Sequence, residues 1–256
     1  GYSGGGGGGG RVAVHCFDGV GSLGGGVQLS ALGGDRGSVG GSGNKVWGSA
    51  GAPGTIFTMD GAVHMLRVDN RPKTANGGTV SISANGNNPR RLTDLEVHDC
   101  VVSLACHIQV SDTTTVGSAV LGLETAASLN TSSMTVAGSS VNADGALSVA
   151  NLSLATTSWT ATSGLDVRSM QLIASTYTSS SEQLVGNGEG RLDVDDASSI
   201  TTPSASNDVL VVKFDELILR GTVQAGMIRV DARNLTTLPS SSLLAAAGID
   251  ITSGHL

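Results

Sequence analysis

The amino-acid sequence predicts an all-β fold, a single-stranded parallel β-helix (a solenoid) for which the right-handed form is favoured. Three observations predict it: a strand-like phrase that recurs at a nearly constant spacing, a shortage of aromatic residues and a surplus of glycine. The 256-residue chain has 2 Trp, 2 Tyr and 3 Phe but 38 Gly. Because stacked coils place equivalent side chains roughly 4.8 Å apart, their narrow core favours aliphatic residues over large rings.

The recurring phrase is an aliphatic residue, a variable residue and then Val or Ile, the period-2 pattern of a strand with one apolar face. It begins at Leu66, Leu95, Ile108, Met134, Leu147, Leu165, Leu192, Leu210, Ile228 and Ile249. The interval is 18 residues from 147 to 165, from 192 to 210 and from 210 to 228, and 21 residues from 228 to 249. Short strands that return at this spacing are typical of one solenoid coil.

Other features of the pattern support strands over helices. A second apolar pair often follows within a coil, as in Leu217-Ile218-Leu219, which indicates two or three strands per turn. The one helical candidate is the run from Leu243 to Ala247, read as a possible terminal cap. The competing all-β fold is a sandwich, whose usual aromatic core and hairpin turns are scarce here, although Asn85-Gly86 and Asp144-Gly145 occur.

Charge and composition exclude several classes of protein. There are 14 Lys and Arg against 21 Asp and Glu, a net charge of −7, and no basic run exceeds Arg90-Arg91, so we expect no nucleic-acid partner. A hydrophobic content of 39% excludes a disordered chain, and clustered glycines with 5 Pro exclude collagen. Apolar stretches such as Leu243 to Ile249 are too short to span a membrane.

The start of the chain, its sequons and its cysteines bear on its compartment. The chain begins Gly1-Tyr2-Ser3, without an initiator Met or a signal peptide, which indicates a processed product or a segment of a longer precursor. Three N-x-S/T triplets are candidate glycosylation sites, at Asn130, Asn151 and Asn234. The odd number of cysteines leaves one thiol over; Cys100 with Cys106 is the closest disulfide pair in sequence, and Cys16 with either remains open.

The glycines divide the chain into a Gly-rich N-terminal segment (1–10), Gly-rich first coils (11–80) and regular coils (81–256). A glycine tract is either a flexible linker or a segment that packs closely against another backbone, since no Cβ intervenes. We expect the second use, with this tract or the end coil docking on a neighbouring copy at the open edge of its β-helix. The expected assembly interface is Gly4, Gly5, Gly6, Gly7, Gly8, Gly9 and Gly10.

The first third of the chain resembles a glycine-rich module of very large secreted and surface proteins of bacteria and unicellular eukaryotes. That module reads approximately G-G-R-I-A-V, A-x-G-G, G-G-A-G-T-I-Y and L-x-V-D-N. The matching elements, in the same order, are Gly8 to Val14, Ala31 to Gly34, Gly51 to Phe57 and Leu66 to Asn70. The resemblance implies an extracellular, adhesin-like β-helical stalk or fibre segment. Two departures are Phe57 in place of Tyr and the unusually long glycine tract.

Residue types with catalytic or metal-binding chemistry occur without a specific motif. The chain has no P-loop, and its G-x-G-x-x-G matches lie within polyglycine. His98, Cys100, Cys106 and His107 have zinc-ligand chemistry, but adjacent strand residues point to opposite faces, which favours core thiols or a disulfide. A second group could serve a lyase or glycosidase, or form a solvated ladder instead: Asp193, Asp195, Asp196, Arg168 and Arg191.

These patterns together predict a structural role. We expect an extracellular or cell-surface glycoprotein, the β-helical subunit of a filament or surface fibre that self-assembles head-to-tail as a homopolymer. We expect no enzyme activity, no catalytic residues, no metal and no cofactor. One alternative is an adhesin or carbohydrate-binding module that uses the flat Ser/Thr/Asn surface, with glycans as partners. The other is a polysaccharide lyase or glycosidase.

Overall fold

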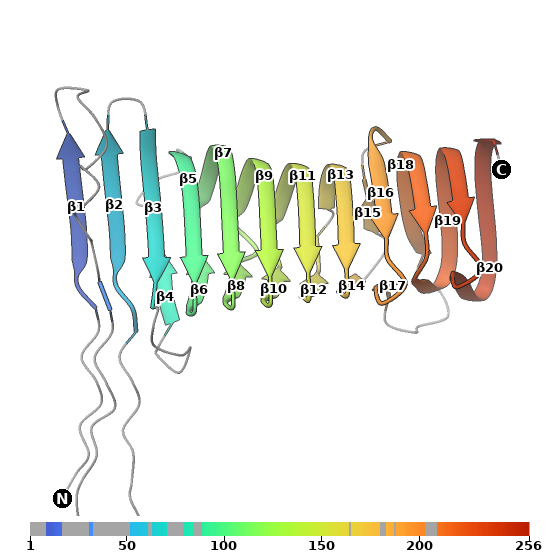
Figure 1. The fold of residues 1–256 in the computed structure, drawn as a ribbon, viewed down its shortest axis with the longest axis horizontal. Coiled ribbons are helices and arrows are strands. Elements are labelled where there is room, and N and C mark those ends of the chain that lie inside the picture. Colours follow the sequence, from blue (N-terminus) through green and yellow to red (C-terminus); the bar gives the residue numbers. More distant parts are fainter. Residues whose placement is uncertain are drawn as a thin grey trace, which may run out of the picture.

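The chain folds as a β-solenoid of about eight turns (Figure 1). The computed structural model describes residues 9–16, 31–32, 52–60, 63–70, 79–83, 89–163, 165–179, 183–186, 188–202 and 209–255. These residues contain twenty strands in one continuous sheet and no helix. All pairings among them are parallel except that of β2 with β3, which confirms the predicted all-β solenoid and excludes a sandwich of antiparallel strands. The hand of the coil stays a prediction.

The strands follow one another along the solenoid axis (Figure 1). The first four are β1 (Arg11–Cys16), β2 (Thr55–Asp60), β3 (Val63–Asp69) and β4 (Thr79–Ile82). The central ones are β5 (Arg90–His98), β6 (Val101–Leu104), β7 (His107–Gly117), β8 (Val120–Leu123), β9 (Ser128–Ala137), β10 (Ser140–Ala143), β11 (Ala146–Ala155), β12 (Ser158–Ala161), β13 (Leu165–Ile173) and β14 (Thr176–Ser179). The last are β15 (Gln183–Val185), β16 (Arg191–Val194), β17 (Ser199–Thr201), β18 (Val209–Leu219), β19 (Thr222–Thr237) and β20 (Ser242–His255).

Each coil has three sides, which we call faces A, B and C. Face A contains the first halves of β5, β7, β9, β11, β13 and β18, together with β15 and the middle of β19 and β20. Face B contains the second halves of the same long strands, β16 and the end of β19, and β1 to β3 extend it at the N-terminal end. Face C contains β4, β6, β8, β10, β12, β14, β17 and the first residues of β19 and β20.

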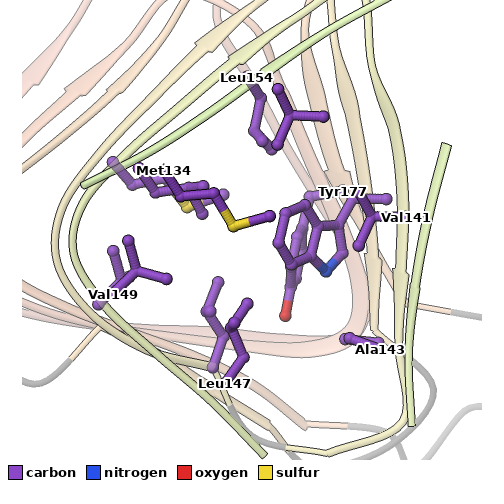
Figure 2. Close-up of a cluster of buried hydrophobic side chains, with 14 of the residues drawn as sticks. Met134, Val141, Ala143, Leu147, Val149, Leu154 and Tyr177 are labelled. Atoms are coloured by element: carbon purple, nitrogen blue, oxygen red, sulfur yellow. The ribbon is translucent and has the colours of Figure 1, made fainter. Parts of the chain in front are cut away.

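The core is a set of rows in which each inward side chain stacks on its equivalent one coil away. On face A, Leu147 lies beside Leu165, and on face B Leu152 lies between Met134 and Met170. These side chains are buried. Figure 2 shows side chains from all three faces, Leu147 of face A, Met134 of face B and Val141 of face C, inside a triangular section. Within each face, every second residue therefore faces the core, which is the period-2 pattern seen in the sequence, and the alternation shifts where a long strand passes from face A to face B.

Two of the few aromatic residues stack in one row of face C. Val141, Trp159 and Tyr177 are consecutive members of that row, and both rings are fully buried with their centroids 6.4 Å apart. The next inward row beside them consists of small residues, Ala143 and Ala161. The narrow section accommodates two large rings here because the neighbouring row is small.

The chain turns from face B to face C through a residue with a left-handed backbone conformation, and a small buried residue follows it. The left-handed residues are Asp99, Ser118, Gly138, Thr156 and Ala174, with φ between 46° and 57°. In the buried position, the Ser139 hydroxyl accepts a hydrogen bond from the Ala119 N–H at 3.1 Å, and the Ser175 hydroxyl accepts one from the Thr157 N–H at 3.0 Å. These hydroxyls satisfy backbone donors that would otherwise be buried without a partner.

Two details of the sequence interpretation are wrong. The 18-residue interval from 192 to 210 does not mark one coil, because Leu192 lies on face B beside Leu217, whereas Leu210 lies on face A beside Ile228. The intervals from 147 to 165, from 210 to 228 and from 228 to 249 are true coil repeats. The run from Leu243 to Ala247 is not a helix but part of β20, since pairing with β19 outweighs the helix propensity of its alanines.

At the N-terminal end, three extended segments pack closely through glycine. The Gly9 N–H donates to the Ala52 carbonyl at 2.8 Å, and the Gly54 N–H donates to the Ala31 carbonyl. A Cβ on Gly54 would overlap the Gly10 carbonyl oxygen, whereas a Cβ on Gly10 would meet open space. Glycine at this end thus serves close backbone packing within the chain, while Gly4 to Gly8 lie outside the described residues.

This packing distinguishes two neighbouring glycines. We expect Gly54→Ala to destabilise the junction by about 1–3 kcal/mol, since the added methyl group has no space, and Gly10→Ala to leave it unchanged. Amide hydrogen exchange in β1 and β2, measured relative to β9, reports the difference. Equal exchange rates in the two variants would contradict the close packing.

Candidate functional site

The acidic cluster around β16 forms an ion-pair network. Asp193 points outward from β16, yet its side chain is only 12% exposed, because Arg191 and Arg220 cover it. The Arg191 Nη2 lies 2.9 Å from Asp193 Oδ2, and its hydrogen bond raises the pKa of the guanidinium. Arg191 Nη1 also lies 3.5 Å from Glu216 Oε2 in the next coil. Asp193 is thus neutralised rather than presented to a ligand.

The other acidic residues of the predicted cluster have separate environments. Asp195 closes the corner after β16, where both carboxylate oxygens accept the Ala174 N–H at 3.1 Å and one accepts the Ser198 hydroxyl. Asp196 is exposed in the same turn, and Arg168 pairs with Glu189 at 3.1 Å on the surface. The described residues contain no group of three potential metal ligands. The carboxylates therefore do not converge on one point, as a calcium or sugar site requires.

Asp193 gives a test of this network. We expect Asp193→Asn to lower the free energy of unfolding by about 1–3 kcal/mol, because two arginines then lie together without their shared carboxylate. Asp112→Asn, at an exposed position on β7, is the matched control and should have little effect. Urea unfolding measures both. A loss in Asp193→Asn no larger than in the control would show that the network is only a surface feature.

The two cysteines whose side chains are described are free thiols in the core, and each is hydrogen-bonded to a backbone carbonyl of the preceding coil. The Cys100 Sγ donates to the Val68 carbonyl and the Cys106 Sγ to the Ile82 carbonyl, both at 3.6 Å. They lie at opposite ends of β6, so the structure does not contain the Cys100–Cys106 disulfide considered from the sequence. The Cys16 side chain lies outside the described residues.

The histidines of the proposed zinc set are not arranged as ligands beside these thiols. The His107 Nδ1 lies 2.8 Å from the Ser128 hydroxyl on the outside of face A, while Cys106 is buried. His98 is an outward residue at the end of β5, where its ring lies against Gly117. The alternation along each strand thus separates the thiols from the imidazoles, as the pleat requires.

Burial makes both thiols poor nucleophiles. Desolvation raises the pKa of Cys100 to about 12 and also raises that of Cys106. In a Cys16→Ser background at pH 8, we expect Cys100 to react with a disulfide reagent roughly a thousandfold more slowly than a free thiol, because its thiolate is so rare. Stopped-flow labelling with and without denaturant measures this. Rapid labelling of both thiols in the native protein would contradict their burial.

The three candidate glycosylation sites lie on the outer surface. Asn130 on β9, Asn151 on β11 and Asn234 on β19 are all exposed. The hydroxyl of Ser132, in the first of these sequons, donates to the Ser111 carbonyl at 2.7 Å. Their accessibility permits modification, and their glycosylation stays a prediction.

The outer surface of face C is uncharged across its central coils. Its outward residues on β10, β12, β14 and β17 are Ser140, Asn142, Ser158, Thr160, Thr176, Thr178, Ser199 and Thr201. They form two rows along the axis, within which the Thr178 and Thr201 hydroxyls lie 3.2 Å apart. This surface offers many weak hydrogen-bonding groups, contributed by Ser, Thr and Asn side chains.

The C-terminal coil exposes the side chains that continue the core. Ile249 and Ile251 on β20 stack on the buried Ile228 and Val230, yet they are 46% and 39% exposed. A shallow hollow of about 310 Å³ lies beside them, lined by Ala225, Leu243 and Ala245 among others. No described strand pairs with the outer edge of β20, so its backbone groups are also available for pairing.

Comparisons with protein-family models, with curated proteins and with solved structures found no match to the chain. Within the described part of the chain, no helix has the length and apolar character needed to cross a membrane.

Proposed function

We propose that this chain is an extracellular structural protein, a β-solenoid subunit that assembles end to end into a filament or surface fibre. The observation that carries the proposal is the apolar C-terminal coil. Ile249 and Ile251 continue buried rows but no described coil covers them, and no described strand pairs with the outer edge of β20. Covering such an edge with another strand buries apolar surface and satisfies backbone hydrogen bonds at the same time.

The side walls favour a structural role over a catalytic one. The outward rows of face C carry neither charge nor an aromatic ring on β10, β12, β14 and β17. Asp193 and Asp195, the acidic residues nearest to a catalytic pattern, are occupied by arginines and by a backbone corner. An uncharged face C, together with carboxylates that are already paired, suits a subunit that interacts chiefly along its axis.

A neighbouring copy is the proposed occupant of the C-terminal edge. β1 is the outermost described strand at the other end, and its free edge offers backbone groups of the kind that β20 also leaves unpaired. Pairing of these edges joins two different surfaces of neighbouring copies. Because each copy then still has one edge free, the same contact can repeat and build a filament. Of the glycine tract before β1, Gly4 to Gly8 belong to the same proposed interface, whereas Gly9 and Gly10 pack against Ala52 and Gly54 within the chain.

The open coil gives the first test of assembly. We expect Ile249→Lys to prevent filament formation, because a buried ammonium group at the contact has no partner. Ile173→Lys is the matched control, since Ile173 is 42% exposed on the side wall, and it should assemble normally. Negative-stain electron microscopy and sedimentation over a range of concentrations measure both variants.

Three results would count against this proposal. Wild-type protein that remains monomeric at all concentrations would overturn it. Equal assembly of the two lysine variants would place the contact elsewhere. Removal of residues 1–8 leaves the Gly9 contact with Ala52 in place, and unchanged assembly after that removal would exclude Gly4 to Gly8 from the interface.

A second candidate function is binding of glycans by the side wall, supported by the two hydroxyl rows of face C. The outward rows of face C have no aromatic side chain on which a sugar ring could stack, so binding there would depend on hydrogen bonds. A glycan array probed with the wild-type protein and with Thr160→Val/Thr178→Val tests it, and equal signals from the two would reject it.

A further inference from the structure

The N-terminal end of the solenoid contains a hollow of about 550 Å³ with an apolar floor. Leu66, Ile82 and Leu92 line it from faces B, C and A respectively, and Phe57 adds a ring from β2. These aliphatic residues belong to the first inward rows of the core, with no described coil beyond β4 and the start of β5. The volume lies within the range of pockets that bind small molecules.

Three arginines surround this apolar floor. Arg11 comes from β1, and Arg90 and Arg91 begin β5. Arg90 occupies an inward position, in register with the buried Ile108, and its Nη2 donates to the Ser83 carbonyl at 2.7 Å. Arg91 is in register with the exposed Gln109, so it lies on the outer side of the strand and borders the hollow at its rim. Arginine side chains from two strands therefore border a hydrocarbon-lined space.

These arginines differ from the other described cations in having no ion pair. The remaining described arginines and lysine each pair with a carboxylate, namely Arg67, Arg168, Arg191, Lys213, Arg220, Arg229 and Arg233. Arg11, Arg90 and Arg91 have no carboxylate within ion-pair distance among the described residues. In a chain of net charge −7, three uncompensated guanidinium groups at one hollow indicate a site for an anion.

We propose that this hollow binds an amphiphile with one hydrocarbon chain and one carboxylate group, as in a medium-chain fatty acid. The carboxylate accepts hydrogen bonds from the guanidinium groups, which match its planar geometry. The hydrocarbon chain lies against Leu66, Ile82, Leu92 and Phe57, where its burial supplies the apolar part of the affinity. The site is separate from the C-terminal coil and does not depend on the assembly proposed above.

A ligand fits this hollow better than another polypeptide coil does. An inward-pointing charge at a sheet edge opposes the addition of a strand, and Arg90 is such a charge on face A. On face B, β2 and β1 extend two strands beyond β3, so a neighbour that pairs with β1 leaves the hollow beside it unfilled. Among the described residues, no coil fills the hollow, which leaves it accessible to a small molecule.

Isothermal titration of the full chain with decanoate, kept below its micelle concentration, tests the proposal. We expect saturable binding of one decanoate, no comparable binding of decanol, acetate or decyltrimethylammonium, and affinity that rises from hexanoate to decanoate. Arg91→Gln and Arg11→Gln should each weaken binding about tenfold, the change expected from the loss of one charge-assisted hydrogen bond. Arg233→Gln is the matched control, since its side chain is 71% exposed near the other end, and it should bind normally.

The other outcomes overturn the proposal. Absence of saturable decanoate binding would do so directly, and equal binding of decanol would remove the role of the arginines. Equal affinity in Arg91→Gln, Arg11→Gln and Arg233→Gln would place the carboxylate elsewhere. Binding to anionic phosphatidylglycerol vesicles without binding of free decanoate would show that the arginines recognise a membrane surface and not a single amphiphile.

Discussion

The structure depends on the register with which each coil stacks on the previous one. In parallel pairing, a slip of one residue would turn every inward side chain to the solvent. The rows through Leu147 and Leu165 on face A and through Val141 and Trp159 on face C are kept by equal numbers of residues between corners. Where a coil is longer, as between Ser175 and Ser198, the extra residues lie in the connections and the rows continue.

Much of the fold is predictable from the sequence because this register appears as a spacing. The phrase that begins at Leu147, Leu165, Leu210 and Ile228 marks real strands, and three of the four measured intervals are coil repeats. The interval from 192 to 210 was wrongly predicted to be one coil because faces A and B both carry an aliphatic-x-Val phrase. Spacing alone does not distinguish one face from the other. The run from Leu243 to Ala247 in β20 was wrongly predicted to be helical. Local helix propensity carries no information about a strand partner twenty residues earlier in the chain.

The sequence predicts the functional surfaces less completely. The acidic residues of the predicted group do not converge on one site, and Asp193 pairs with Arg220, which is 27 residues away and adjacent only through coil stacking. Arg90 and Arg91 are adjacent in the sequence, whereas Arg11 lies far from them in the chain and reaches the same hollow only through the pairing of β1, β2 and β3. In both cases the missing information was which charged residues the coiling of the chain brings together, because the strand phrase specifies only the inward apolar positions.

Distances between spin labels along face C test most directly whether all coils stack in one continuous register. Ser103, Gly122, Asn142, Thr160, Thr178, Thr201 and Gln224 are successive members of one outward row. Pulsed electron paramagnetic resonance on label pairs 103/224 and 142/224 should give narrow distributions whose means differ by about 10 Å, two strand spacings. Equal means, or a difference far from that value, would contradict a single stacked solenoid.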